Sequence, residues 1–304
     1  MSRKESFFSF YGALHRPFTI LELASYLNGV EDSVRILDEE TKENRLVEED
    51  GFFILAPHKT GFGMARRKQD LLLDEKWKLL TKRARWFRFI PFVEFVIASG
   101  SMAIGNVNRD SDFDVLVGVK RGRIFTTRYL INFVFSILRS RRLDDHEGTS
   151  PDKLCFNHFV TEQSFAKEPF NFYRAELYRH MVPIYGSREA LETFFTVNAW
   201  SGAGPEKNMR DLRFREQQPN VIRSIVGFIL GGAFGDLIER KILGSIARKR
   251  LSTYVTGKEE GGRVVISEQE LEFHFELPYE EEFAFLELNK KAEPPTRGGS
   301  ASKY

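Results

Sequence analysis

The chain carries, at residues 92–119, the sequence FVEFVIASGSMAIGNVNRDSDFDVLVGV. Its two apolar runs, 92–98 and 112–119, have the length and the β-branched and aromatic content of buried strands. Gly100-Ser101 directly follows the first run, and Asp112-Phe113-Asp114 opens the second. This order predicts a strand, a short turn into a helix, and then a second strand that begins with two acidic side chains.

The turn and the acidic strand carry complementary chemistry. At a strand-to-helix turn, glycine lets an anion approach the backbone N–H groups closely, and the Ser101 hydroxyl adds a donor. Side chains two apart on a strand point to one face, so Asp112 and Asp114 should converge while Phe113 and Val115 pack on the other face. Two carboxylates suit Mg²⁺ that accompanies the phosphates of a nucleotide.

These residues resemble the polymerase-β-like nucleotidyltransferase superfamily, whose signature is Gly-Ser or Gly-Gly, a spacer of about this length, and Asp-x-Asp on a strand. The resemblance covers roughly residues 90–165. It implies a Mg²⁺-dependent reaction, with Mn²⁺ as the other candidate metal, in which a hydroxyl attacks the α-phosphorus of an NTP. Asp112 and Asp114 would then be catalytic metal ligands, and Gly100 and Ser101 would hold the triphosphate.

Two further residues extend the resemblance. Arg109 and Ser111 complete an Arg-x-Ser-Asp-x-Asp pattern that is common in the superfamily. The resemblance therefore implies that Arg109 and Ser111 also belong to the nucleotide-binding site.

One feature departs from the superfamily pattern, which usually includes a third carboxylate on a later strand. The next expected strand, 153–161, reads KLCFNHFVT and has no acid. Asn157 lies in the expected region, and His158 should face the opposite way, where a core histidine is the alternative to a general base. We predict Asn157 as the third catalytic position. Acids near the strand that could substitute are Asp144, Asp145, Glu147, Asp152 and Glu162.

Composition limits the remaining choices. The chain has 304 residues and one cysteine, Cys155, which excludes an internal disulfide and a zinc site built from cysteines. No signal-peptide core is evident at the N-terminus, and the longest apolar candidate span, 225–234, is far shorter than about 20 residues. We expect a cytoplasmic protein with no membrane partner. For residues 225–234 a buried helix is favoured over a helix on a membrane surface.

Charge is unevenly distributed although the net charge is only +2. Residues 64–90 carry nine basic and three acidic side chains, and residues 119–142 carry seven basic and none acidic. Residues 31–50 carry nine acids against three basics, and residues 259–293 carry eleven against three. The two basic segments favour a phosphate-rich partner, whereas the acidic segments should repel nucleic acid.

The first 57 residues resemble a winged helix-turn-helix module. Helices are expected at 6–15, at 20–27 after a Thr19 cap, and at 30–46, followed by a hairpin that turns at Asp50-Gly51. The third helix is rich in acids, whereas a DNA-reading helix needs basic or amide side chains on its outer face. We therefore favour a partner-binding or packing role over DNA binding.

The predicted fold class is α+β, with a winged helix, a central nucleotidyltransferase domain of mixed sheet and helices, and a helical C-terminal domain. A connecting helix should occupy residues 58–90, the nucleotidyltransferase core 91–165, and the mostly helical domain 166–289. Within the core, residues 124–138 should form a buried helix. Residues 290–304, rich in Pro, Gly and Ser, should be a disordered tail.

The leading functional hypothesis is an enzyme that moves an NMP from an NTP to a hydroxyl acceptor. An RNA end is the weakly favoured acceptor, and a protein side chain or a small molecule are the alternatives. A second hypothesis is a catalytically impaired pseudoenzyme that binds nucleotide or RNA. A third is a DNA-binding regulator whose nucleotidyltransferase domain senses a ligand. The base, the pathway and the oligomeric state are not specified by these patterns.

Overall fold

The computed structural model describes residues 3–27, 29–57, 60–142, 150–167, 172–245 and 263–274. Of these, residues 3–57 belong to one compact unit and residues 60–274 to a second. The chain as a whole is α+β, as predicted, with helices and a mixed sheet.

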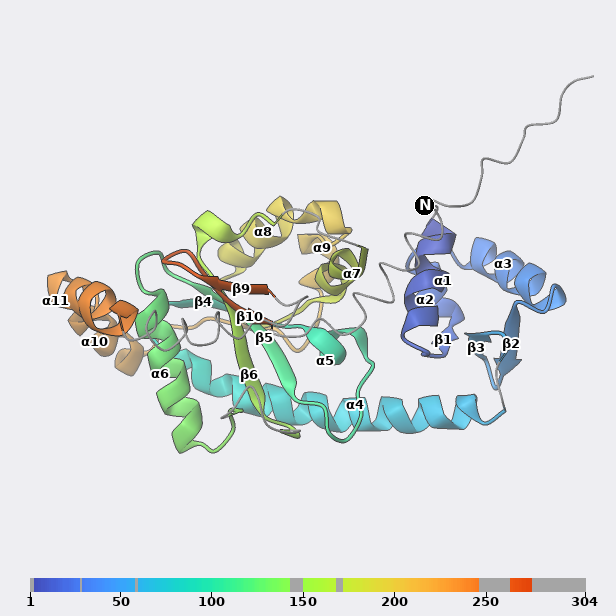
Figure 1. The fold of residues 1–304 in the computed structure, drawn as a ribbon, viewed down its shortest axis with the longest axis horizontal. Helices are drawn as coiled ribbons and strands as arrows, with labels where there is room; N and C mark the ends of the chain where they lie inside the picture. The colour runs from blue at the N-terminus through green and yellow to red at the C-terminus, as the bar shows by residue number, and fades with distance from the viewer. Residues whose placement is uncertain are drawn as a thin grey trace, which may run out of the picture. The chain divides into compact units, whose positions relative to one another are not determined.

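The first unit has three helices and a small antiparallel sheet. Its elements are, in order, α1 (Arg3–Ala13), β1 (Phe18–Thr19), α2 (Ile20–Ala24), α3 (Val30–Lys42), β2 (Leu46–Glu49) and β3 (Phe52–Leu55), and the strand order is β1-β3-β2 (Figure 1). The hairpin turns at Asp50 and Gly51, as predicted, with both residues at positive φ.

Local signals account for most of these boundaries. Thr19 caps α2 in a reciprocal arrangement with Glu22, as a capping box requires. The predicted extension of α3 to residue 46 was wrong, because Asn44 adopts φ 56° and ends the helix, and Leu46 starts β2. The aromatic rings of α1 form the core: Phe7 lies 4.8 Å from Phe18 and 5.0 Å from Tyr26 between ring centroids.

A buried carboxylate ties α3 to the rest of this unit. Glu40 is only 4% exposed and accepts from Arg45 Nε at 2.5 Å, and Lys4 Nζ lies 2.5 Å from its other oxygen. Hydrogen bonding by Arg45, assisted by Lys4, lowers the pKa of Glu40 to about 2.

Glu40 should therefore make the first unit sensitive to acid. Because its folded pKa lies below the ordinary value of 4.5, its stabilisation is complete above about pH 4.5 and is lost as pH falls toward 2. We expect Glu40→Gln to reduce the change in the stability of the first unit between about pH 4.5 and pH 2. Amide hydrogen exchange of residues 3–57 in the full chain measures that stability. Glu31→Gln, on the exposed start of α3, is the control, and an unchanged slope for Glu40→Gln would contradict the assignment.

The second unit is built around a seven-stranded sheet with the order β8-β7-β4-β5-β6-β10-β9. Its N-terminal part comprises α4 (Phe62–Ala84), the 3₁₀ helix η1 (Arg85–Phe89), β4 (Val93–Ala98), α5 (Gly100–Ile104), β5 (Phe113–Val119), α6 (Ile124–Ile137) and β6 (Leu154–Val160). β4 and β5 are antiparallel, whereas β5 and β6 are parallel. The strands predicted at 92–98, 112–119 and 153–161 and the helix predicted at 124–138 are thus confirmed within one residue at each end.

The later part of the chain completes the same sheet. It comprises η2 (Glu162–Ser164), α7 (Phe172–His180), β7 (Val182–Gly186), α8 (Arg188–Val197), η3 (Ala199–Ser201), α9 (Pro205–Asn208), β8 (Arg215–Glu216), α10 (Val221–Ile229), α11 (Ala233–Leu237), the π-helix η4 (Ile238–Leu243), β9 (Arg263–Ile266) and β10 (Glu270–His274). The segment predicted as a separate helical domain therefore supplies four strands, β7 to β10, and its described residues share one compact unit with β4 to β6.

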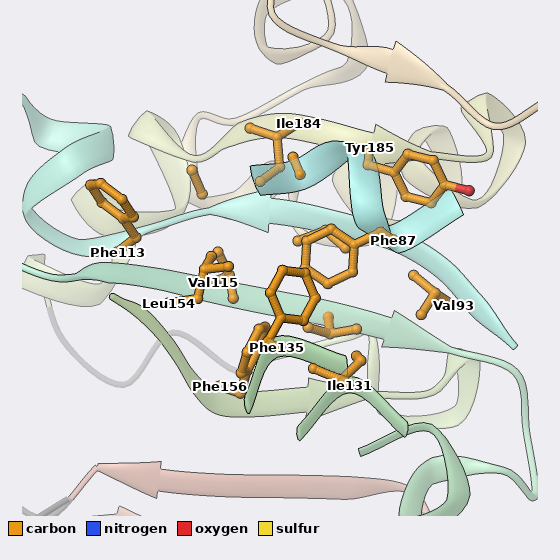
Figure 2. Packing of buried hydrophobic residues seen from close by; sticks show 14 of the residues in the cluster. Phe87, Val93, Phe113, Val115, Ile131, Phe135, Leu154, Phe156, Ile184 and Tyr185 are labelled. Atoms are coloured by element: carbon orange, nitrogen blue, oxygen red, sulfur yellow. The ribbon is translucent and has the colours of Figure 1, made fainter. Parts of the chain in front are cut away.

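Helices cover both faces of the sheet (Figure 1). On one face, α4, η1 and α6 pack through Leu80, Phe87 and Phe135 against a cluster that includes Phe113 and Val115 of β5. Figure 2 shows Phe87 and Phe135 beside Val115. On the other face, α8 packs through Phe194 and Phe195 against residues such as Leu116. Leu116 alternates with Val115 and Val117, so Asp114 shares the α8 face of β5 with Leu116.

The prediction that residues 225–234 form a buried helix was wrong. α10 ends at Ile229 before Gly231 and Gly232, and it has no buried residue. Phe228 is 87% exposed and Val221 is 75% exposed. Among the described residues, no single helix has both the length and the apolar content needed to cross a membrane, although α10 with residues 233–241 meets these criteria as a pair bent by 70°.

Candidate active site

The turn after β4 brings Gly100 against the carboxylate of Asp114. Ser99 N donates to the Asp114 carbonyl at 3.0 Å, which holds the end of β4 beside the start of β5. Gly100 has φ 58°, and a Cβ built on it would lie 2.3 Å from Asp114 Oδ2. Only glycine satisfies both the backbone conformation and the close approach.

Asp112 and Asp114 converge, as predicted. Both are half-buried, and one carboxylate oxygen from each lies within 4.8 Å of the other and of Cys155 Sγ. Phe113 and Val115 point into the opposite core. The alternation of the strand therefore places two acids on one face immediately beside the Gly100 turn.

Each carboxylate already has a partner within the protein. Arg142 NH1 donates to Asp112 Oδ2 at 2.9 Å, and Asn157 Nδ2 donates to Asp114 Oδ1 at 3.3 Å. The structure thus brings Asn157 to the acidic pair, as the sequence pattern indicated. Its amide donates a hydrogen bond there, whereas a carboxylate in the same place would repel Asp114 unless a cation lay between them.

Cys155 is a site residue that the sequence analysis missed. In the parallel pairing of β5 with β6, Cys155 lies directly opposite Asp114, and it is 5% exposed. A lone cysteine within an apolar strand carries no signal of its own. Only the register between two strands, which are separated by α6 in the sequence, brings its thiol beside the carboxylates.

The donor set suits a divalent cation. Two carboxylates and an amide that can present its oxygen after a side-chain flip are hard oxygen ligands of the kind that Mg²⁺ and Mn²⁺ prefer. The Cys155 thiol is softer and would add affinity for thiophilic metals. Arg142 supplies positive charge to Asp112 in this structure, so a cation at the carboxylates competes with the Arg142 guanidinium.

A buried lysine forms hydrogen bonds with the loop that precedes Asp112. Lys76 of α4 is 3% exposed, and its Nζ donates to the carbonyls of Ser111 at 2.8 Å and Arg109 at 3.3 Å. The same Nζ bonds Asp152 Oδ1 at 2.7 Å, just before β6. One ammonium group therefore joins α4 to the two segments that lead into the acidic strand and into the strand of Cys155 and Asn157.

The remaining predicted nucleotide-binding residues, Ser101, Ser111 and Arg109, lie in three different environments. Ser101 is half-buried in the first turn of α5, one residue after Gly100. Ser111 uses its hydroxyl in the preceding loop, where it accepts from Asn108 N at 2.9 Å and donates to Asn108 Oδ1. Arg109 is exposed. The geometry gives Ser111 a role in shaping the loop before Asp112.

His158 lies in a buried network of charges. Its Nε2 is 3.1 Å from Glu270 Oε1 and 3.9 Å from Glu272 Oε2 on β10. Lys167 bonds Glu270 at 2.5 Å, and Arg174 lies 3.5 Å from Glu272. Because two cations already neutralise the two glutamates, this group is an ion-pair network that secures β10 to β6, which gives His158 a structural role.

The acids considered as substitutes for a third carboxylate do not join the pair in the part of the chain that the structure describes. Asp152 bonds Lys76, and Glu162 begins η2 beyond the far end of β6. Asp144, Asp145 and Glu147 lie outside the described residues.

A cavity of about 910 Å³ lies at the other end of the strands, away from the acidic pair. Its walls include Phe92, Glu94, Lys120 and Glu162, from the start of β4 and the ends of β5 and β6. Burial, together with the nearby charge of Glu162, raises the pKa of Glu94. The acidic pair therefore lies at the opposite end of β5 and is not part of this cavity.

Comparisons with protein-family models, with curated proteins and with solved structures found no match to this chain.

Gly100→Ala should destabilise the protein more than an alanine at an equally left-handed but open position. Gly122 has φ 72° and open space around its α-carbon, so Gly122→Ala costs about 1 kcal/mol for the backbone conformation alone. Gly100→Ala must also displace the Asp114 side chain, so it should lower the free energy of unfolding by about 1 kcal/mol more than Gly122→Ala does. Urea unfolding of both variants measures the difference, and equal losses would show that the Asp114 contact is not tight.

Lys76→Met should lower the free energy of unfolding by about 3 kcal/mol, because it leaves Asp152 and two carbonyl groups without their buried donor. Lys78→Met is the matched control on the same helix, since Lys78 is exposed and pairs with the exposed Asp74. We expect no measurable change for the control. Urea unfolding compares the two, and a loss shared by both variants would contradict the specific role of Lys76.

Proposed function

We propose that this protein is a Mg²⁺-dependent nucleotidyltransferase that moves an NMP from an NTP to a hydroxyl acceptor. The observation that carries the proposal is the convergence of Asp112 and Asp114 beside the tight Gly100 turn. A glycine turn suited to phosphates and a carboxylate pair suited to a divalent cation meet at the ends of two neighbouring strands. Their arrangement supports the resemblance drawn from the sequence.

In the proposed reaction the acceptor oxygen forms a bond to the α-phosphorus, the bond from that phosphorus to the bridging oxygen breaks, and pyrophosphate leaves. Gly100 and Ser101 would hold the phosphates through backbone N–H groups and the hydroxyl. Asp112 and Asp114 would hold Mg²⁺, which neutralises phosphate charge when bound. For this, Arg142 must give up its contact with Asp112, which leaves its guanidinium available to the phosphates.

Among the residues that the structure describes, none near the acidic pair is placed as a base for the proton of the acceptor hydroxyl. The Asn157 amide cannot take up a proton at neutral pH, and His158 is engaged with Glu270. The proton would pass to solvent. This feature favours the second candidate function, a catalytically impaired protein that binds NTP or RNA without transferring a nucleotide.

RNA remains the weakly favoured acceptor. Some of the basic residues that suggested it are internal, since Arg66 pairs with Asp70 and Lys76 holds the site loops. Others are exposed along α4 and η1: Lys68, Lys82, Arg85 and Arg88. These exposed cations can contact a phosphate backbone.

We propose a winged-helix module for the first unit, supported by its three helices and terminal hairpin. The cations of α3 pair with acids of the same helix: Arg35 with Asp32 and Glu39, and Lys42 with Asp38. Such pairs leave little positive charge for DNA phosphates. A protein partner is therefore the favoured ligand of this unit.

Transfer of label from each α-labelled NTP tests the proposal, with Mg²⁺ or Mn²⁺ and with total RNA and cell lysate as acceptors. We expect the wild type to label a product and Asp112→Ala/Asp114→Ala to lose at least a hundredfold of that activity. Asp110→Ala, an exposed acid of the preceding loop, is the matched control and should retain it.

Asn157→Asp separates the two candidate functions. If the missing carboxylate limits catalysis, this variant should transfer label faster than the wild type, because it adds a metal ligand and a base. Absence of transfer by both proteins, with NTP binding retained in equilibrium dialysis, would instead establish the nucleotide-binding alternative.

A further inference from the structure

α10 is an amphipathic helix that presents its apolar side to the outside. Val221, Ile222, Ile225, Phe228 and Ile229 recur at the spacing of one helix face, and all are exposed. The inward side includes a polar anchor, Arg223, and a small residue, Gly227, beside the half-buried Val226. Arg223 donates to the Val93 carbonyl at 2.7 Å and to the Tyr185 hydroxyl at 3.2 Å, and Gly227 faces Pro91.

The apolar exposure continues beyond α10. Phe234 and Leu237 of α11 are also exposed, and Trp86 of η1, the 3₁₀ helix against which α10 packs, is 43% exposed. Isolated apolar residues on a surface need no explanation, but a contiguous apolar helix face indicates a binding surface. We call this surface, formed by the named residues of α10, α11 and Trp86, the apolar end face.

Cations border the apolar end face on two sides. Arg85, Arg88 and Arg215 line a small cavity with Gln218, just before α10. Lys120, Arg121 and Arg240 line another beside α11.

Two of the acids near these cavities have partners within the protein. Asp236 pairs with Arg123 at 2.6 Å. Glu239 is buried and accepts from the backbone N–H groups of Phe125 and Thr126 at the start of α6. Glu216 and Glu268, which also line these cavities, are exposed. The six exposed cations named above outnumber these two acids, so the border of the apolar end face is positive.

From these observations we infer that the apolar end face binds the surface of an anionic lipid membrane. An exposed apolar helix with tryptophan, phenylalanine and flanking cations matches what an interfacial helix needs to insert among headgroups and acyl chains. The bent pair of α10 with residues 233–241 also has the length and apolar content of a membrane segment. The inference is independent of the proposed nucleotidyltransferase activity.

Vesicle sedimentation of the full chain tests this inference. The vesicles are phosphatidylcholine alone or phosphatidylcholine mixed with phosphatidylglycerol. We expect binding to the anionic vesicles that weakens as salt increases. Ile225→Asp/Phe228→Asp should lower the partition coefficient at least tenfold. Leu71→Asp is the matched control, because Leu71 is equally exposed but lies on α4.

Two further measurements make the outcome decisive. Thermal unfolding should show that Ile225→Asp/Phe228→Asp folds as stably as the wild type, and Arg85→Glu/Arg88→Glu should lose binding to anionic vesicles. Failure of the wild type to bind anionic vesicles, or equal binding by Ile225→Asp/Phe228→Asp, would overturn the inference. A wild-type dimer in light scattering that this variant dissociates, with no vesicle binding, would overturn it in favour of contact between two copies of the chain.

Discussion

The buried ammonium of Lys76 is the interaction on which the candidate site depends. Lys76 lies on α4, which packs against one face of the sheet. Its ammonium group bonds both to the loop that precedes Asp112 and to Asp152, just before β6. A buried charge is costly unless it is fully hydrogen-bonded. Here its three acceptors come from segments that must be in place together, so the pairing of this one group aligns the acidic strand with the strand of Cys155 and Asn157.

The rest of the site follows from strand geometry. Alternation along β5 separates Phe113 and Val115 from Asp112 and Asp114, and the antiparallel pairing with β4 sets Gly100 against Asp114. The parallel pairing with β6 adds Cys155 and Asn157. What results is a carboxylate pair whose present partners are an arginine and an amide. That arrangement suits a cation, and among the described residues no third acid joins the pair.

The charged side chains of this protein fall into two groups: some are paired within the protein, and others are exposed beside the apolar end face. The two cations of α3 pair with acids of the same helix, and Lys76 and Arg66 of α4 are used inside the second unit. The exposed cations of η1 and the loop after β5 instead border the apolar end face. The polar anchor Arg223 holds α10 with its apolar side outward, an orientation that is unfavourable in water unless another apolar surface covers it.

The sequence alone determined the local elements and the acidic pair. Apolar runs, the Thr19 cap and the Asp50-Gly51 turn are local signals, and the two-residue period of a strand is enough to place Asp112 and Asp114 on one face. The tertiary structure decided what depends on pairing between distant segments: Cys155 opposite Asp114, His158 with Glu270, and β7 to β10 in the central sheet. It also decided which side of α10 faces outward, because periodicity shows that a helix has an apolar face but only the packing of its neighbours shows where that face points.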